Sequence, residues 1–435
     1  MPEYLKKANP PLATGETSVT AVVQAILEDI RVGGEATALE YAAKFDGYTG
    51  GDIALSPELV EAAIHSIPDG LKSDIQFAHD NIRRFAELQR NCIQDGEMEV
   101  SPGFKAGQKC IPLSCCGCYV PGGRYSHIAS ALMTVTTAKV AGVKRIIVCS
   151  PPGKDGTMHP AIVYAAHLCG ADSILAIGGV QAIAVMAGGL FGLEKADIIV
   201  GPGNQFVAEA KRLLFGSIGI DQLAGPTDSL VVGDCTADPV LVATDLVGQA
   251  EHGYNTPVWL VTDNRQLAET VMKLIPGMIS ELPELNGAQA ALAWRDYGEV
   301  ILCTSRSEML SACNEYAPEH LHVQAEDLPW WLDNLTSYGS LFLGEETTVP
   351  YGDKAAGPNH CLPTSRAARY TGGLSVHKFL KIVTWQQCTR EASKKVSLIS
   401  ARISRVEGME GHARCSDVRM KKFFPDEANS MQLEP

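Results

Sequence analysis

The chain has 435 residues, of which 46% are hydrophobic and 20% charged, enough for a large core divided into two or three compact units. Its formal net charge of −14, with no long run of Lys or Arg, argues against nucleic acid or an anionic membrane surface as the main partner. No stretch of about eighteen apolar residues is free of charge, and the opening MPEYLKKANP lacks the apolar segment of a signal peptide. A cytoplasmic protein is therefore expected.

The first hundred residues read as helical, after a tail expected at 1–14. Apolar residues fall on one helical stripe between Val19 and Ile30, and Gly33-Gly34 predicts the end of that helix. Ser56-Pro57 opens a second helix, with Pro at the first helical position, and residues 71–89 form a long amphipathic segment.

From about residue 110, short β-rich runs alternate with helical patterns. RIIVCSPPG is followed by PAIVYAAHLCG, SILAIGG by VQAIAVMAGG, and DIIVGPGN by QFVAEAKRLLF. The same rhythm resumes at residue 238 with DPVLVATDLVGQAEHG, PVWLVTD and EVILCTS. This alternation predicts two α/β sheets of parallel strands, and the last sixty or so residues, from TGGLSVHKF, read as helical.

Glycine-rich turns follow several of these strands, where open α/β sheets bind ligands. No GxGxxG motif is present, and GPGNQF at 201–206 stops short of it. Its glycines could let the backbone approach a cofactor or merely make a tight turn. A bound dinucleotide would therefore lack the usual fingerprint.

The 13 cysteines include a cluster of four between residues 110 and 118. No second Cys pair follows at the spacing of a zinc site, so packing is favoured over metal binding. Free thiols in a reducing compartment are the simplest interpretation. The members of the cluster are Cys110, Cys115, Cys116 and Cys118.

Two stretches place groups able to bind a metal or move protons close together. In GQAEHG, Gln249 and His252 are three residues apart and share a helix face, so they could ligate one ion, although a His that meets the helix dipole is the commoner explanation. In NEYAPEHLHV, Glu319 and His320 are adjacent and could form an acid/base pair, with a solvated loop as the alternative.

Two further stretches add oxygen and nitrogen ligands. The loop YGDKAAGPN at 351–359 places Asp353 beside Lys354, and EGMEGHA at 407–413 contains Glu407 and His412. Such a set would suit Zn²⁺ or another borderline divalent ion. The spacing by itself leaves oxidation and hydrolysis of a polarised substrate both open. The remaining candidates are His127 and His360.

Taken together and in this order, these stretches resemble the histidinol dehydrogenase family over nearly the whole chain. The resemblance implies a zinc-dependent homodimer that uses NAD⁺ to oxidise a primary alcohol twice, through an aldehyde to a carboxylic acid. It implies two incomplete Rossmann-like α/β domains, an N-terminal helical segment and a C-terminal helical extension that reaches the partner subunit. The motifs that carry it are YVPGG (119–123), AKVAG (138–142), PGNQFVAEAKR (202–212), AGPTD (224–228), QAEHG (249–253), YAPEHL (316–321), GSLFLG (339–344), TGGLSV (371–376) and EGMEGH (407–412).

The resemblance also suggests domain boundaries. We expect the first α/β domain in 15–118 and 229–374, with the zinc and acid/base residues, and the second in 119–228, with the NAD⁺ contacts. The helical extension is expected in 375–435. It would exchange between subunits, so that each active site is shared.

Roles carry over to this chain by position. The family's base and water-activating residue fall on His320 and Glu319. Its zinc ligands fall on Gln249, His252, Asp353 and His412, and its NAD⁺ contacts fall on Tyr119, Gln181 and Asn204. Substrate contacts are expected at Thr227, Gln249, His252, His320, Asp353, Lys354, Glu407, His412, Arg124 and His127.

Departures from the family pattern bear on the substrate. Lys354 stands where histidinol dehydrogenases usually have Tyr, and GGRYSH adds Arg124 and His127. These cationic groups favour an anionic substrate over cationic histidinol. The combination resembles the sulfopropanediol dehydrogenase branch of the family, which oxidises 2,3-dihydroxypropane-1-sulfonate to 3-sulfolactate. The retained Glu407 matches a carboxylate that contacts the histidinol amine, and it argues the other way.

Three alternatives remain beside the sulfonate substrate. The first is histidinol dehydrogenase activity itself, from L-histidinol to L-histidine. The second is a zinc hydrolase, because zinc with a Glu–His pair also activates water, and turnover without NAD⁺ would favour it. The third is a non-catalytic metal-binding homologue, which is disfavoured because every expected ligand and the Glu–His pair are present.

Overall fold

The computed structural model describes residues 2–11, 16–50, 52–122, 126–153, 156–223 and 225–430. It divides into two compact units, each described here by itself. The main unit comprises Met1–Arg90 and Pro112–Phe379, and the C-terminal unit comprises Asn91–Ile111 and Leu380–Pro435.

The main unit contains a five-stranded parallel sheet with the strand order β6-β5-β4-β7-β8. Its strands are buried on both sides, as expected when helices cover both faces. Helices α1, α6 and α7 share one hydrophobic cluster with this sheet, while α4 contacts β4 and β5. The strands are β4 (Cys115–Tyr119), β5 (Arg145–Ser150), β6 (Ser173–Ala176), β7 (Ile198–Val200) and β8 (Gly219–Ile220). The helices are α1 (Glu16–Asp46), α2 (Pro57–Ser66), α3 (Asp69–Asn91), α4 (Ile128–Ala141), α5 (Pro160–Leu168), α6 (Gly179–Gly188) and α7 (Gln205–Leu214).

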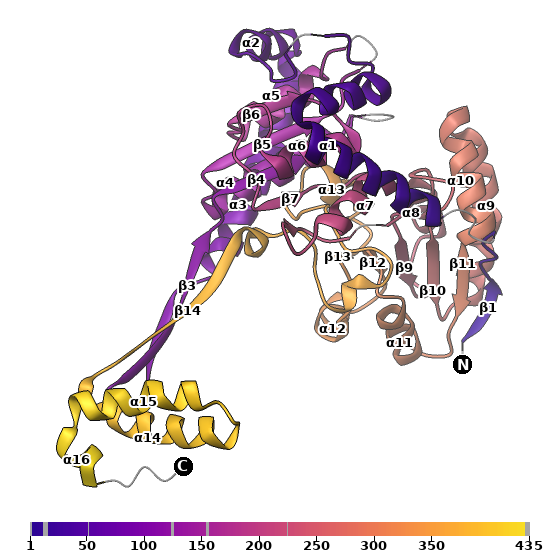
Figure 1. Cartoon of the computed structure of the whole chain (residues 1–435). Coiled ribbons are helices and arrows are strands. Elements are labelled where there is room, and N and C mark those ends of the chain that lie inside the picture. The colour runs from indigo at the N-terminus through magenta and orange to yellow at the C-terminus, as the bar shows by residue number, and fades with distance from the viewer. Residues whose placement is uncertain are drawn as a thin grey trace. The chain divides into compact units, whose positions relative to one another are not determined.

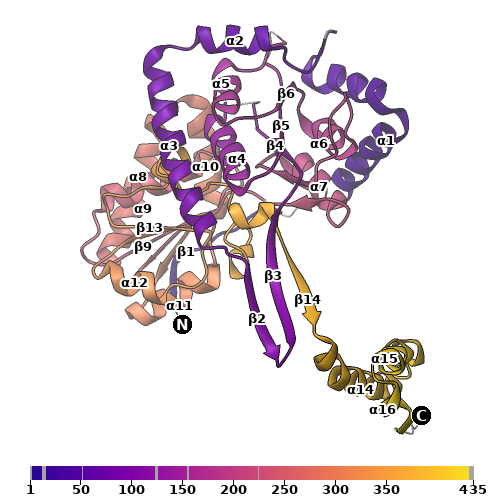
Figure 2. The ribbon, with the colours of Figure 1, turned by 90° about the vertical axis from the view of Figure 1, so that its left-hand side faces the viewer.

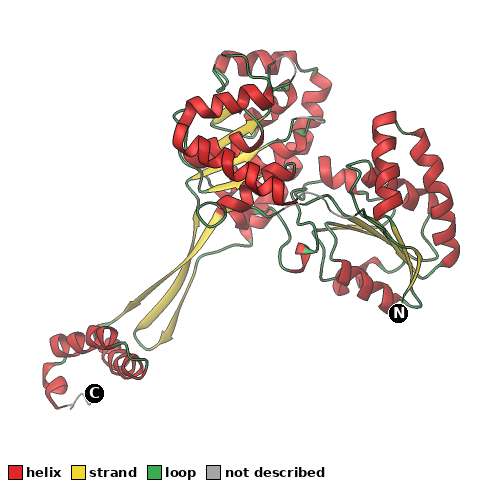
Figure 3. Ribbon diagram, turned by 45° about the vertical axis from the view of Figure 1, so that its right-hand side comes forward, coloured by secondary structure: helices red, strands yellow, loops and turns green. Residues whose placement is uncertain are grey.

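A six-stranded sheet with the order β1-β11-β10-β9-β12-β13 forms the other layer system of the main unit. All its pairs are parallel except that of β1 with β11. Residues of α8, α9 and α10 pack on one face and residues of α11 and α12 on the other, and Figure 3 shows helices on both sides. The strands are β1 (Glu3–Lys6), β9 (Ser229–Gly233), β10 (Val258–Thr262), β11 (Glu299–Leu302), β12 (His320–Gln324) and β13 (Ser340–Leu343). The helices are α8 (Pro239–Ala250), α9 (Arg265–Glu281), α10 (Glu284–Tyr297), α11 (Arg306–Tyr316), α12 (Leu328–Asn334), α13 (Val349–Lys354), η1 (Ala367–Arg369) and η2 (Val376–Phe379).

The C-terminal unit combines a small sheet with a helical pair. Strands β2 (Gly96–Ser101), β3 (Phe104–Pro112) and β14 (Leu380–Cys388) form a three-stranded sheet in the order β14-β3-β2. Figure 2 shows the three strands side by side. Helix α14 (Arg390–Val406) packs against α15 (Glu410–Phe423), and α16 (Pro425–Ser430) follows.

The α/β class and the parallel sheets expected from the sequence are confirmed. Capping residues in the sequence explain where two helices near the expected site residues begin. Asp238 caps α8 by accepting a hydrogen bond from Val240, and Pro239 fills the first helical position. Asn204 caps α7 in the same way.

The N-terminal region differs from the expectation in two respects. Residues 3–6 are not a tail, because they pair with β11 as an antiparallel edge strand. The glycine pair does interrupt the first helix as expected, because Gly34 (φ 64°, ψ −142°) is not helical, and a second helical segment of α1 then runs on to Asp46. The apolar stripe of α1 packs against α6 and α7 of the five-stranded sheet (Figures 1 and 2), and not with 229–374 as the predicted boundaries grouped it.

The other difference concerns β structure at both ends of the C-terminal unit. The sequence indicated helix for the first hundred residues and the last sixty, yet 96–101 and 380–388 are strands of one sheet with 104–112. Strands β2 and β14 are exposed at nearly every position, and β14 pairs with a strand that lies far from it in sequence. Gly107 permits the pairing, since a Cβ there would lie 2.5 Å from the ring of Trp385.

Candidate active site

A cavity of about 780 Å³ opens at the carboxyl ends of the five-stranded sheet. Tyr119 ends β4, Pro151 follows β5, Gly179 follows β6 and Asn204 follows β7, and all four line it. This edge is where open parallel sheets bind ligands, and the volume suits a cofactor-sized molecule.

The three expected NAD⁺ contacts all line this cavity. Burial raises the pKa of Tyr119 to about 12, and its hydroxyl accepts a hydrogen bond from the Gly179 N–H at 3.2 Å. Gln181 is buried and donates its side-chain amide to Asp46 at 2.8 Å. The Oδ1 atom of Asn204 caps α7 by accepting hydrogen bonds from Phe206 and Val207, which leaves its NH₂ group as a donor for a ligand.

The GPGN turn beside Asn204 is held from beneath by a buried ion pair. Lys211 donates to the carbonyl of Gly201 at 2.9 Å and pairs with Asp221, which accepts from the Gly201 N–H at 2.8 Å. Gly201 itself has φ 114°, and a Cβ there would lie 2.0 Å from the carbonyl oxygen of Tyr119. The glycine therefore serves the close approach of β7 to the end of β4.

A second group of side chains lies at the amino end of β12 in the six-stranded sheet. Glu319 precedes the strand and His320 begins it, and both are buried, with 6% and 3% exposure. The Nδ1 atom of His320 lies 3.8 Å from Oε2 of Glu319, and its Nε2 atom lies 3.5 Å from Oδ1 of Asp353. Neither ring nitrogen has a hydrogen-bond partner in the described part of the chain, so both remain available to a ligand.

Burial and mutual charge set the protonation of this group. Burial raises the pKa of Glu319 to about 8, against the opposing charge of His320. Burial would lower the pKa of His320, but the carboxylates of Glu319 and Asp353 outweigh it and raise that pKa to about 9. Burial would raise the pKa of Asp353, but contact with His320 and its charge hold it at about 2. Two groups that exchange protons near neutral pH thus lie beside a carboxylate that stays ionised.

Asp228 is a member of this group that the sequence did not assign a role. One carboxylate oxygen accepts the backbone N–H of Glu319 at 2.6 Å, and the other accepts that of Ser365 at 2.9 Å. Asp228 in turn donates its N–H to Oε2 of Glu319 at 3.3 Å. The only sequence signal was its place in AGPTD, immediately before β9 and next to the expected substrate contact Thr227, which is half-buried.

Three of the four expected metal ligands belong to the main unit. Gln249 lies on the last turn of α8, and its buried Oε1 atom has no partner among the described residues. Loss of solvent lowers the pKa of His252, although the residue keeps an exposed surface, and nearby Asp353 only partly opposes this shift. Together with ionised Asp353, these give an orphaned amide oxygen, a neutral imidazole and a carboxylate, a donor set that fits zinc.

The fourth expected ligand, His412, and the expected substrate contact Glu407 belong to the C-terminal unit. His412 is exposed on α15, and Glu407 is exposed at the C-cap of α14. Within the described residues no group of three or more His, Cys, Asp or Glu side chains is placed to hold a metal.

Asp245 connects the three elements that carry the expected metal ligands of the main unit and the expected base. It lies one turn before Gln249 on α8 and accepts hydrogen bonds from Gln324 of β12 at 2.7 Å and from Thr348 at 2.8 Å. Its carboxylate also lies 3.2 Å from Nδ1 of His322. Thr348 is the N-cap of α13, which carries Asp353.

His127 lies in the cavity lining and also near the expected metal ligands His252 and Asp353. It lines the cavity, and burial together with the positive charges of Lys354 and His252 lowers its pKa. Lys354 is exposed beside Asp353. Arg124, the other cation expected at the substrate, lies outside the described residues.

His360 has a structural explanation. Its ring lies 2.9 Å from Ser130 Oγ and 3.1 Å from the carbonyl oxygen of Asp353, so it fixes the backbone at that residue. Burial lowers its pKa to about 4, which keeps the ring neutral.

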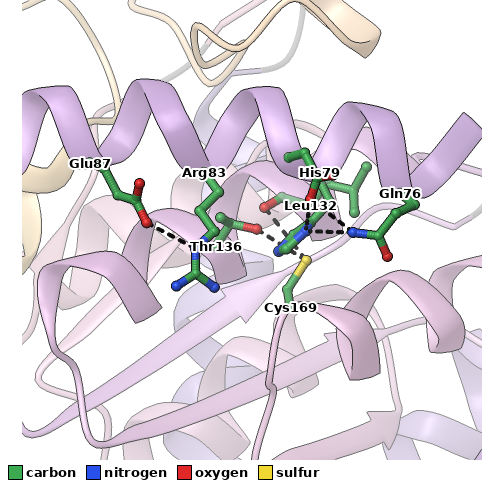
Figure 4. A network of polar contacts seen from close by, with 8 residues as sticks. Gln76, His79, Arg83, Glu87, Leu132, Thr136 and Cys169 are labelled. Atoms are coloured by element: carbon green, nitrogen blue, oxygen red, sulfur yellow. Dashed lines mark hydrogen bonds and ion pairs between the residues drawn. The ribbon is translucent and has the colours of Figure 1, made fainter.

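The cysteines show no metal-binding arrangement. All 13 are free thiols, and Cys116 and Cys118 lie 3.7 Å apart in the core. His79 on α3 and Cys169 after α5 also have their hydrogen-bond partners within the protein (Figure 4). There His79 lies within 3.5 Å of Gln76, and Cys169 accepts a hydrogen bond from Thr136 at 3.1 Å.

The two sites together can support hydride transfer coupled to proton transfer. The cavity has room for a dinucleotide, and His127 in its lining is near enough to Lys354, His252 and Asp353 for their charges to act on its pKa. A hydrolase would use the Glu319–His320 pair and the expected metal ligands, but it would have no use for a cavity of dinucleotide size. No helix in the described residues is both long and apolar enough to cross a membrane.

Comparison with known proteins agrees with this geometry. The family described as Histidinol dehydrogenase matches residues 12–420. The chain is 66% identical to sulfopropanediol 3-dehydrogenase from Ruegeria pomeroyi, over 98% of each protein. It is 37% identical to histidinol dehydrogenase from Thermus thermophilus, over 93% of this chain and 95% of that protein. The crystal structure of histidinol dehydrogenase from Elizabethkingia anophelis matches with a TM-score of 0.88 and 34% identity, covering 95% of this chain and 94% of that one.

Proposed function

The chain belongs to the histidinol dehydrogenase family, enzymes that oxidise a CH–OH group, and we propose that it oxidises 2,3-dihydroxypropane-1-sulfonate to 3-sulfolactate with zinc and NAD⁺. The observation that carries the proposal is the buried Glu319–His320–Asp353 group, linked through His127 to a cavity of dinucleotide size. The 66% identity to a sulfopropanediol 3-dehydrogenase supports the choice of substrate.

Gln249, His252 and Asp353 would hold the metal, with His412 from the C-terminal unit as the fourth ligand. Tyr119, Gln181 and Asn204 would hold the dinucleotide. When bound, zinc would lower the pKa of the substrate hydroxyl and NAD⁺ would accept the hydride, twice for each carboxylate formed.

In the first oxidation, His320 takes the proton of the alcohol at the ring nitrogen that faces Asp353. It must be neutral to do so, and a cation held by Asp353 would offset the carboxylate charge that raises its pKa. In the second oxidation, the aldehyde adds water, and Glu319 takes a proton from that water. The burial of Glu319 raises its pKa toward the range in which a carboxylate is an effective base near neutral pH.

Lys354 would bind the sulfonate. It is exposed next to Asp353, and its charge reaches His127 at the inner end of the cavity. A charge-assisted bond to an oxyanion is strong enough to select such a substrate. Thr227, His127 and Arg124 would complete the contacts. Glu407 would lie near the substrate through the C-terminal unit, where it could accept a hydroxyl proton.

A homodimer with shared active sites is part of the proposal. An apolar stripe runs along α14 on positions three and four apart, and Val406 within it is 91% exposed. A stripe of this kind usually covers a protein partner, here a second copy of the chain. The members of the stripe are Val396, Ile399, Ile403 and Val406.

The thirteen free thiols agree with a reducing, cytoplasmic compartment.

The test compares substrates on the zinc-loaded enzyme by the absorbance of NADH. Turnover of dihydroxypropanesulfonate but not of histidinol, lost in Lys354→Tyr with zinc retained, is the expected result. Lys144→Tyr, which removes another exposed Lys of the main unit, serves as the matched control. Turnover of histidinol alone would replace the sulfonate by histidinol, and turnover of an ester without NAD⁺ would favour the hydrolase.

A further inference from the structure

The nucleotide-sized cavity contains one carboxylate, that of Asp46, the last residue of α1. Its Oδ2 atom accepts hydrogen bonds from the N–H of Gly178 at 2.9 Å and from the side-chain amide of Gln181 at 2.8 Å. Both of these hydrogen bonds end on Oδ2, and none in the described part of the chain ends on Oδ1. Asp46 is therefore held in place by one oxygen and presents the other to a ligand.

Charge is distributed unevenly along the cavity. Asp46 is the only Asp or Glu among its described lining residues, and none of these is Lys or Arg. The other group that can ionise near neutral pH is His127. A ligand in the cavity thus meets a fixed negative charge at Asp46, with no described cation to offset it.

The strand order places the two ends of the cavity, at Asp46 and at His127, apart from each other. Gly178 and Gln181 follow β6, the edge strand, whereas His127 follows β4, two strands away. Two strand spacings amount to about 10 Å. The nicotinamide must reach the alcohol carbon next to Asp353 and His320, so it takes the end at His127. The adenosine half is then left to the end at Asp46.

We propose that Asp46 is a specificity-determining residue, which accepts a hydrogen bond from the adenosine ribose of NAD⁺ and excludes NADP⁺ by repelling its 2′-phosphate. This inference rests on the proposed use of a nicotinamide dinucleotide. A carboxylate suits a ribose hydroxyl, which is a donor, and does not suit a phosphate, which is an acceptor with negative charge.

Calorimetric titration of the full-length, zinc-loaded enzyme with NAD⁺ and with NADP⁺ tests this without turnover. We expect the wild type to bind NAD⁺ more tightly than NADP⁺, and Asp46→Asn to reduce that preference about tenfold or more, mainly by strengthening NADP⁺ binding. The Asn side chain keeps one oxygen as acceptor toward Gly178 and Gln181. Asp52→Asn, at an exposed carboxylate outside the cavity lining, is the matched control.

Asp46→Glu, which keeps the charge, should keep the preference for NAD⁺, and thermal denaturation without ligand checks that each variant is folded. Equal loss of both nucleotides in Asp46→Asn would overturn the inference, since Asp46 would then only hold Gln181. Equal binding of the two nucleotides by the wild type would overturn it as well. Binding of neither nucleotide to the folded wild type would instead overturn the proposed function.

Discussion

The backbone N–H of Glu319 donates to Asp228 at 2.6 Å, and the backbone N–H of Asp228 donates to the carboxylate of Glu319 at 3.3 Å. This reciprocal pair joins the start of β12 to the start of β9, two neighbouring strands of the six-stranded sheet. It fixes both the main chain and the carboxylate of the residue proposed to activate water. On the proposed mechanism, Asp228 would act on the reaction through Glu319.

Asp228→Asn should slow the second oxidation more than the first. The amide can accept only one of the two hydrogen bonds that the carboxylate accepts from Glu319 and Ser365, so Glu319 loses its fixed position. A misplaced general base typically costs about 10- to 100-fold in rate. The measurement is the separate kcat for the alcohol and for the aldehyde.

Asp172→Asn is the control for Asp228→Asn, because Asp172 also accepts a backbone hydrogen bond, from Ile146 at 2.9 Å, but lies in the five-stranded sheet. An equal loss in both oxidations would show that Asp228 supports the fold of the site as a whole and not Glu319 in particular.

Glu319→Gln should separate the two oxidations completely. The first step needs only His320 as a base, whereas the hydration of the aldehyde loses its base, at a cost of about 10²-fold or more. Free or enzyme-bound aldehyde should then accumulate, and trapping with a carbonyl reagent measures it. Unchanged yields of the acid would mean that another group activates the water.

Zinc should stabilise the fold measurably. At a free concentration about 100 times its Kd, a ligand that binds only the native state adds about 2.7 kcal/mol to the free energy of unfolding. Removal of zinc with a chelator should lower Tm and abolish turnover, and added zinc should restore both.

Gln249→Ala should remove most of this stabilisation, because the buried Oε1 atom is a proposed ligand. Gln266→Ala, at an exposed position on α9, serves as the control and should keep the response of Tm to zinc. A full response in Gln249→Ala would exclude its amide from the metal site.

Gly201→Ala tests the close approach of β7 to Tyr119. A Cβ at residue 201 would lie 2.0 Å from the Tyr119 carbonyl oxygen, and φ is 114°. The matched variant is Gly216→Ala, where φ is 103° but nothing lies within 4 Å, so it reports the backbone strain alone. We expect a loss of about 1–2 kcal/mol in unfolding free energy at residue 216 and at least about 2 kcal/mol more at residue 201, measured by urea denaturation. Equal losses would show that β7 can shift without cost.

Short-range patterns in the sequence were enough to predict the α/β class and the places where chemistry gathers. Gln249 lies on the last turn of α8 and His252, three residues on, lies in the turn just past its end, and Glu319 and His320 are chain neighbours. Turn residues after β-rich runs marked the edge of the five-stranded sheet where the cavity lies, because the carboxyl ends of parallel strands meet at one edge. These relations depend only on the chain within a few residues.

Only the tertiary structure shows the contacts between residues that lie far apart in the chain. Asp46 meets Gln181 across 135 positions, Glu319 meets Asp228 across 91, and Thr348 meets Asp245 across 103. Strands 96–101 and 380–388 are exposed at nearly every position, and the pairing of 380–388 with β3 joins segments that are far apart in the chain. A side chain that is an ordinary surface carboxylate by its local sequence becomes a buried acceptor only when folding brings its donors to it, and no local pattern encodes that distance.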